Sequence, residues 1–165
     1  MAKEFSFDIV SKVNLQEVHN AINQAKKEAQ TRFDLKTAAC ELLFNEAEMQ
    51  ITATAANELA LKNLVDLIKS KFVRRAIDLK FIYFSPPEPA GGKKFRQTGK
   101  LTEGINSETA KLISKEIKDL KRKVTVQIES DKLRVASKSK DELQAVIRFL
   151  KEKDYKVPLQ FANFR

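Results

Sequence analysis

The stretch DKLRVASKSKDELQAVIRFL, residues 131–150, carries a strand pattern directly before a helix pattern. Its apolar residues first alternate at Leu133 and Val135, the period of a half-buried strand, and then recur at helical steps of three and four. The stretch AEMQITATAANELALKNLVDL, residues 47–67, shows the same two patterns 84 positions earlier, with Ile51 corresponding to Val135. This internal repeat predicts two copies of one folding unit.

The flanking sequence completes each copy. Alternating apolar residues predict strands, and apolar residues at helical spacing predict helices, one of them opened by Asn14 and another by a capping box from Ser139 to Glu142. The expected strands cover 5–10, 40–45, 49–54, 81–84, 94–101, 124–128, 133–135 and 159–163, and the expected helices begin near 15, 57, 107 and 140. The predicted fold class is α+β: two ferredoxin-like (βαββαβ) domains from an internal duplication, each a four-stranded antiparallel sheet with two helices on one face.

The segment SPPEPAGG, residues 85–92, separates the two copies. Three prolines and two glycines in eight residues exclude a helix or a central strand. The segment is therefore predicted to be a linker, and the sequence by itself places the domain boundary there.

The net charge of +9 and the isoelectric point of about 9.6 favour an anionic partner. The charge is uneven along the chain: residues 1–84 hold 12 Lys and Arg against 11 Asp and Glu, whereas residues 85–165 hold 19 against 11. A polyanion is expected to meet the second half first. Solubility is the alternative explanation of the excess.

Several classes of protein are disfavoured. One cysteine, Cys40, excludes an internal disulfide, and its apolar neighbours predict a buried, unreactive thiol. No stretch approaches the ~18 apolar residues of a transmembrane helix, so no membrane partner and a cytoplasmic location are expected. The lone His19 has no nucleophile to activate, and neither an acid/base carboxylate pair nor a metal-binding pattern is apparent. We expect no catalysis and no cofactor.

Two motifs of nucleotide-binding proteins are also incomplete. Residues 91–94, GGKK, have the composition of a phosphate-binding loop but lack the spacing and the Ser or Thr of a P-loop, which favours a linker end. The strands MQITAT and LRVAS contain no aromatic residue, which disfavours the base stacking of RNA-recognition motifs.

Basic residues recur at helical spacing in the third helix. They are Lys111, Lys115, Lys118 and Arg122, at steps of four, three and four. The spacing places all four on one stripe, roughly opposite the apolar face, where they could contact successive phosphates. An ordinary solvated helix face is the alternative interpretation.

A second basic set lies on predicted strands. Arg96 and Lys100 share one face of the post-linker strand, and Arg134 and Lys138 point away from the apolar face of the last hairpin. Arg and Lys on an open sheet face could hold a phosphodiester. The alternative is the charged outer face of an antiparallel sheet, which requires no ligand.

Five segments, taken in order, resemble the YajQ family of small bacterial proteins. They are FDIVSKVNLQEVHNAINQAKKEAQTRFD, RQTGKLTEGI, KEIKDLKRKVTVQI, LRVASKSKDELQAVI and the terminal QFANFR. The resemblance runs from end to end. It implies that the N-terminal strands of the two ferredoxin-like domains are exchanged, so that one domain comprises 12–102, including the linker 85–93 and the strand 94–102, and the other comprises 1–11 plus 103–165.

The resemblance also implies a function. The family binds nucleotides and nucleic acids, and some members act as cyclic di-GMP effectors. The expected function is therefore non-catalytic binding of a nucleotide, a cyclic dinucleotide or nucleic acid through a basic surface, with a regulatory protein as a further partner. The alternative is a protein–protein adaptor whose basic face docks an acidic partner.

Overall fold

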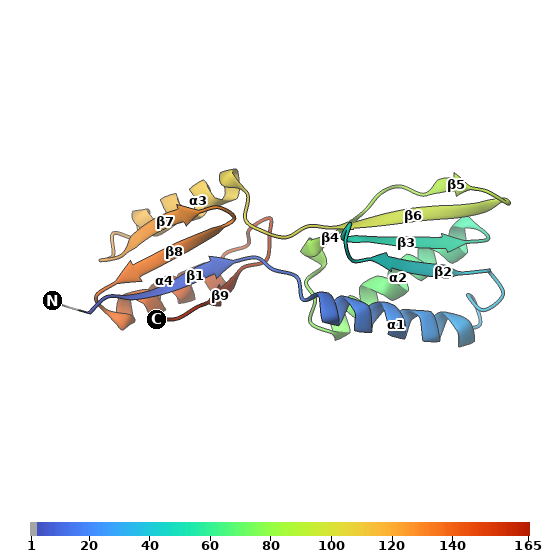
Figure 1. Cartoon of the computed structure of the whole chain (residues 1–165), viewed down its shortest axis with the longest axis horizontal. Coiled ribbons are helices and arrows are strands. Elements are labelled where there is room, and N and C mark those ends of the chain that lie inside the picture. Colours follow the sequence, from blue (N-terminus) through green and yellow to red (C-terminus); the bar gives the residue numbers. More distant parts are fainter. Residues whose placement is uncertain (1–2) are drawn as a thin grey trace. The chain divides into compact units, whose positions relative to one another are not determined.

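The computed structural model describes residues 3–165 and divides them into two units of mixed α and β structure (Figure 1). One unit, the β6 unit, comprises Val13–Thr102. The other, the β1 unit, combines the N-terminal residues up to Lys12 with Glu103–Arg165. Residues 85–92 lie inside the β6 unit, so the boundary that the proline-rich segment suggests is wrong.

The β1 unit packs two helices against a four-stranded antiparallel sheet. Its elements are β1 (Phe5–Val10), α3 (Ser107–Asp119), β7 (Thr125–Glu129), β8 (Lys132–Ser137), α4 (Lys140–Lys151) and β9 (Gln160–Ala162). The strand order is β7-β8-β1-β9. The buried core has apolar residues from both helices and from the sheet, with Phe7, Val135 and Ile113 fully buried.

The β6 unit has its own sheet and its own core. Its elements are α1 (Leu15–Thr31), β2 (Glu41–Asn45), β3 (Gln50–Ala55), α2 (Glu58–Arg74), a short 3₁₀ turn (Leu79–Phe81), β4 (Ile82–Phe84), β5 (Glu88–Ala90) and β6 (Lys94–Leu101). The strand order is β2-β3-β6-β4, with β5 also pairing with β6. The strand predicted over 94–101 is confirmed at both ends.

The two sheets have the same order when β6 is matched with β1. The hairpin β7-β8 then corresponds to β2-β3, and β9 corresponds to β4. The register supports this match, because Phe7 lies opposite Val135 in one sheet and Gly99 lies opposite Ile51 in the other.

Asparagine caps begin three of the four α-helices of residues 3–165. The Oδ1 atoms of Asn14, Asn57 and Asn106 accept hydrogen bonds from the third backbone N–H that follows, at 3.2, 2.8 and 2.8 Å. The capping box predicted at the start of α4 is wrong. Ser139 occupies the cap position without a side-chain bond, and Glu142 reaches Arg122 instead.

The proline-rich segment contains a short strand that its composition did not predict. Glu88–Ala90 pairs with Lys94–Arg96 through a tight turn in which Gly92 and Lys93 have positive φ angles of 72° and 61°. Pro89 is tolerated because β5 is an edge strand. Residues 91–94 therefore form a hairpin turn.

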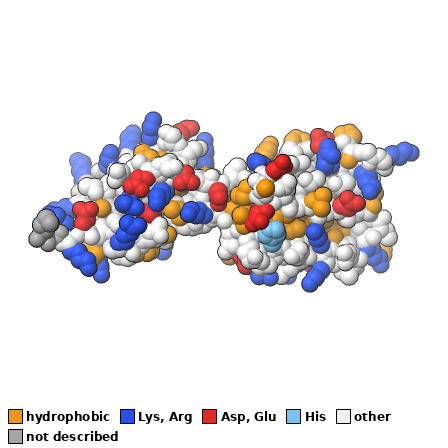
Figure 2. Space-filling model, in the orientation of Figure 1, with side chains coloured by type: hydrophobic (Ala, Val, Ile, Leu, Met, Phe, Trp, Pro, Cys, Tyr) orange, Lys and Arg blue, Asp and Glu red, His pale blue; other side chains and the backbone are white. Residues whose placement is uncertain are grey.

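Charge is shared almost equally by the two units. The β6 unit holds 14 Lys and Arg against 10 Asp and Glu, and the β1 unit holds 17 against 12. The net charges are +4 and +5. The basic second half of the chain is therefore not one folded unit, because β6 carries its basic residues into the β6 unit. Figure 2 shows Lys and Arg side chains over both.

Candidate nucleotide-binding surfaces

The exposed face of α3 carries three lysines, Lys111, Lys115 and Lys118, which we call the lysine row. Ala110, Ile113 and Ile117 bury the opposite face against the sheet, so the helical repeat directs the lysines toward solvent. The lysine row surrounds a shallow open pocket of about 400 Å³, also lined by Ser114, Asp119 and Ile128. Within residues 3–165 none of the three ammonium groups has a hydrogen bond or an ion pair.

Arg122, the fourth residue of the predicted stripe, is not part of this pocket. It follows the end of α3, and its guanidinium lies 3.5 Å from a carboxylate oxygen of Glu142 on α4. The structure thus brings together three of the four stripe residues and gives the fourth a carboxylate partner.

The outer face of the β1 sheet is organised around a buried carboxylate. Asp8, in the central strand β1, is 1% exposed. Its Oδ1 accepts a hydrogen bond from Arg134 Nε at 3.2 Å, and its Oδ2 accepts from Lys132 Nζ at 3.3 Å and from Asn163 Nδ2 at 2.7 Å. Arg134 also lies 3.6 Å from Glu129. Arg134 is therefore already engaged by carboxylates within the β1 sheet.

These contacts set the ionisation of Asp8. Burial raises the pKa of its carboxyl group, but the hydrogen bonds from Asn163, Arg134 and Lys132 outweigh burial and hold the pKa below its ordinary value. Sequence analysis missed Asp8, Lys132 and Asn163. The available signal was the single acidic residue inside the otherwise uncharged strand Phe5–Val10.

Lys138 follows β8 and is exposed, without a hydrogen bond or ion pair to any other described residue. Arg96 and Lys100 lie on the outer face of the other sheet, in the β6 unit. Arg96 donates to Glu88 from Nε at 3.0 Å, and Lys100 Nζ donates to the backbone carbonyl of Glu48 at 2.7 Å. The four cations predicted for sheet faces are thus divided between two sheets, and two of them have carboxylate partners.

The remaining candidates have structural surroundings. The His19 ring lies 4.7 Å from the Phe44 ring, and its Nε2 is 3.7 Å from Glu46. Cys40 is half-buried, and its thiol lies 3.6 Å from the backbone carbonyl of Leu35. Burial, and then the negative charge of Asp34, raise the pKa of this thiol, which disfavours the reactive thiolate.

Residues 3–165 show neither a candidate metal site nor a helix that could span a membrane. No group of three or more His, Cys, Asp or Glu side chains could hold a metal ion. No helix in this range combines the length and the apolar content needed to cross a bilayer.

Comparison with known proteins identifies the family. The family model described as "Nucleotide-binding protein YajQ-like" matches residues 5–165. A "Nucleotide-binding protein" of Carboxydothermus hydrogenoformans is 51% identical, and another of Chloroherpeton thalassium is 48% identical, each over the full length of both chains. A third, from a Synechococcus strain, is 46% identical over the same length. The chain belongs to the YajQ-like family.

Proposed function

We propose that this protein binds nucleotides or nucleic acid without transforming them, through phosphate contacts made by the lysine row. The observation that carries the proposal is the arrangement of Lys111, Lys115 and Lys118 around one pocket, with all three ammonium groups unpaired among the described residues. Asp119 is the only carboxylate in the lining of that pocket. The pocket is therefore net positive.

The chemistry of lysine suits this role. An ammonium group is a compact charge with three donors, and it binds phosphate oxygens without demanding a fixed fork geometry. Each phosphate that a lysine neutralises releases counterions, so binding weakens steeply as salt rises. The Ser114 hydroxyl in the same lining adds an uncharged donor.

The other predicted cations have supporting roles in this proposal. Lys138 has no partner among residues 3–165, and Lys100 uses one of its three donors on the Glu48 carbonyl, so both keep donors for a phosphate. Arg96, Arg122 and Arg134 would have to share their guanidinium groups with Glu88, Glu142 and Asp8. We therefore expect the lysine row to contribute more than the arginines.

The family resemblance supports a narrower version of the proposal. The ligand would be nucleic acid or a cyclic dinucleotide such as cyclic di-GMP, bound in the cytoplasm, and the bound state would alter contact with a regulatory protein. The relatives that are named nucleotide-binding proteins support binding of a nucleotide in general.

We also infer that the units, residues 12–102 and 1–11 plus 103–165, are two copies of one ferredoxin-like module with exchanged first strands. The matching strand orders support this inference, because β6 and β1 take the same position in the two sheets. The chain passes from one unit to the other after Lys12 and after Thr102, directly beyond the ends of β1 and β6.

The test is a titration with single-stranded RNA at ~50 and ~200 mM salt, alongside a titration with cyclic di-GMP. The variant replaces Lys111, Lys115 and Lys118 by Gln. We expect weaker RNA binding and a salt slope reduced by about 0.7 for each lysine removed. Saturable cyclic di-GMP binding lost in the same variant would identify the dinucleotide as the ligand of this surface.

The control variant replaces three exposed lysines elsewhere, Lys62, Lys93 and Lys156, and makes the same change in net charge. It should bind RNA almost as the wild type does. Equal weakening in both variants would mean that only net charge matters and would refute a site on α3. Absence of binding to either ligand, with retention of an acidic protein partner, would favour the adaptor.

A further inference from the structure

A second basic surface lies in the β6 unit, between the two helices α1 and α2. A groove of about 700 Å³ opens there to solvent. Its charged lining residues are Lys27, Glu28, Lys71, Arg74 and Arg75. The other two lining side chains, Gln24 and Thr31, are polar, so every lining residue carries a hydrogen-bonding group.

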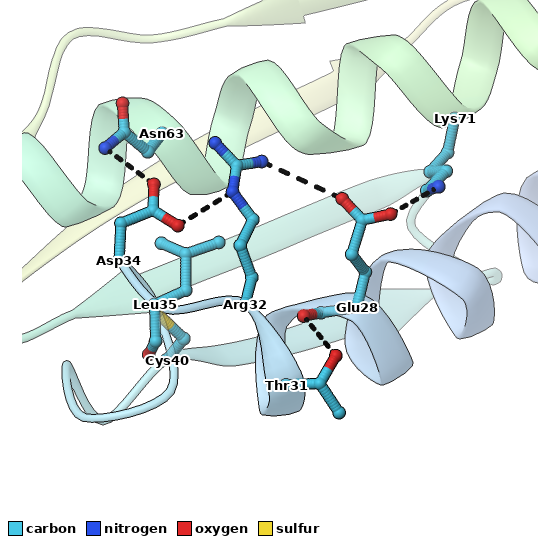
Figure 3. A network of polar contacts seen from close by, with 8 residues as sticks. All are labelled: Glu28, Thr31, Arg32, Asp34, Leu35, Cys40, Asn63 and Lys71. Carbon is cyan, nitrogen blue, oxygen red and sulfur yellow. Dashed lines mark hydrogen bonds and ion pairs between the residues drawn. The ribbon is translucent and has the colours of Figure 1, made fainter.

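One cation of the groove is buried. Lys71 is 7% exposed, and its Nζ donates to Glu28 Oε1 at 2.9 Å, across the interface between the helices (Figure 3). Arg32 lies 3.8 Å from the other Glu28 oxygen. The hydrogen bond from Lys71 lowers the pKa of Glu28, and the nearby charges of Lys71, Arg32 and Arg74 add to this effect against the opposing effect of burial.

The groove has more positive charge than its carboxylates neutralise. Four cations line it with the single carboxylate Glu28, and Arg75 takes part of its compensation from Glu17 at 3.5 Å. Lys27 and Arg74 form no hydrogen bond or ion pair within residues 3–165. Lys71 donates one of its three ammonium hydrogens to Glu28. Unpaired donors on both helices therefore border the same hollow.

Helix electrostatics explain only part of this arrangement. Cations in the last turn of a helix stabilise its carbonyl end, which accounts for Lys71 and Arg74 at the end of α2. Lys27 belongs to α1 and directly precedes the last turn of that helix, outside the turn in which this effect is strongest. A bound anion would satisfy Lys27 together with Arg74.

We propose that the α1–α2 groove is a phosphate-binding site in which Lys27 and Arg74 contact the anion from opposite helices, and Lys71 in the same lining adds positive charge. Arg74 provides a planar fork for two phosphate oxygens, and Lys27 provides a point charge. The groove exceeds the size of one phosphate, so the chemistry that fits is a pyrophosphate group or two neighbouring phosphates of a nucleic acid. The site lies in a different unit from the lysine row and does not depend on it.

The first probe is inorganic pyrophosphate, titrated by calorimetry at neutral pH into the full chain. Replacing both Lys27 and Arg74 by Gln should weaken its binding about tenfold or more, because each residue donates a charge-assisted hydrogen bond. Both side chains are exposed, so the fold should be retained. Lys71 is left in place because its removal would take away the hydrogen-bond donor of Glu28. In backbone amide spectra, pyrophosphate should perturb α1 and α2 selectively.

A matched control replaces Lys62 and Lys93 by Gln in the same unit, outside the groove. It should bind pyrophosphate like the wild type, and so should the variant of the lysine row. Wild-type affinity in the variant with Lys27 and Arg74 replaced, or no pyrophosphate binding by the wild type, would overturn the proposal.

A second titration, with single-stranded RNA, separates the two sources of phosphate. RNA binding that falls in the groove variant means that the groove accepts a nucleic-acid backbone. RNA binding that stays unchanged while pyrophosphate binding falls means that the groove takes a small phosphorylated ligand. Neither outcome changes the test of the lysine row, because the variant of Lys111, Lys115 and Lys118 leaves the groove intact.

Discussion

Equivalent positions at the centre of the two sheets hold very different residues. In the β1 sheet, opposite Val135, Phe7 is fully buried, with the rings of Phe161 and Phe164 each 5.9 Å away. In the β6 sheet the residue opposite Ile51 is Gly99. An added Cβ at Gly99 would lie 2.7 Å from Phe84 and 2.9 Å from Ile82, so side chains of β4 fill the space that Phe7 fills in the other unit.

The next position along each strand differs in charge. Asp8 is buried on the outer face of the β1 sheet between Arg134 and Lys132. The equivalent residue in β6 is Lys100, which pairs in register with Gln50 and donates to a backbone carbonyl. The β1 sheet thus neutralises its own outer face, and unpaired cations of that unit lie on α3. In the β6 unit, unpaired cations lie in the α1–α2 groove.

Two sheets with the same strand order thus fill their cores with different side chains and carry different charges on their outer faces. A four-stranded sheet covered by two helices must have its core-facing side filled by side chains. The side chains at a given point can come from the central strand itself or from the strand beside it. Charge on the outer face is less constrained where the side chain is exposed, as at Lys100, whereas the buried Asp8 requires the partners that it has.

The largest expected effect comes from Phe7→Ala. Removing a fully buried aromatic side chain should lower the free energy of unfolding of the β1 unit by about 3–5 kcal/mol. Hydrogen exchange should show lost protection in β7, β8, α3 and α4, with protection in the β6 unit retained. Phe164→Ala is the control, because Phe164 is 59% exposed and should cost much less. Equal loss in both units would contradict their separate cores.

Asp8→Asn should have the next largest effect. It leaves Arg134 and Lys132 without their shared carboxylate and should destabilise the β1 unit by about 2–3 kcal/mol at neutral pH. Because the folded-state pKa of Asp8 lies below that of the unfolded chain, about 3.9, its stabilisation is present above that pH and is lost as the pH falls through the folded-state pKa.

Urea unfolding of wild type and Asp8→Asn at neutral pH and below about pH 4 tests this. The gap between the two proteins should narrow in acid. Lys100→Gln, at the equivalent position of the other sheet, should change stability by no more than about 0.5–1 kcal/mol, because Lys100 is exposed. A gap that stays constant with pH would show that Asp8 stabilises by packing alone.

Gly99→Ala should have a smaller effect than Phe7→Ala or Asp8→Asn. The added methyl group meets Phe84 and Ile82, which must shift, so we expect a loss of about 1–2 kcal/mol in the β6 unit. Gly91→Ala is the matched control, because an added Cβ there meets nothing within 4 Å. Thermal unfolding of both variants measures the difference. An unchanged or raised melting temperature for Gly99→Ala would show that the β6 core adapts more easily than this packing suggests.

Local patterns were sufficient to predict most elements. The strand Lys94–Leu101 was predicted with its observed bounds, and Asn14 marked the start of α1. The errors arose where a local rule competes with a distant partner. Ser139 to Glu142 matches a capping box, but Glu142 binds Arg122 on another element. The proline-rich segment forms an edge strand because β6 supplies its hydrogen bonds.

The candidate site divides in the same way. The spacing of Lys111, Lys115 and Lys118 was enough to place them on one helix face, because helical geometry is local. Spacing could not reveal that Arg134 is held by Asp8, 126 residues away, or that Arg96 is held by Glu88 across a hairpin. It also missed the α1–α2 groove, because Lys27 and Arg74 meet only when two helices pack.

The amino-acid sequence by itself determined where strands and helices form, the internal repeat and the overall positive charge, since these depend on neighbouring residues and on composition. Only the tertiary structure decided which sheet each of β1 and β6 joins, and therefore that the units carry +5 and +4 instead of a neutral half and a basic half. The physical reason is that strand pairing and ion pairing join residues that are far apart in the chain, and their partners are selected only when the sheets assemble.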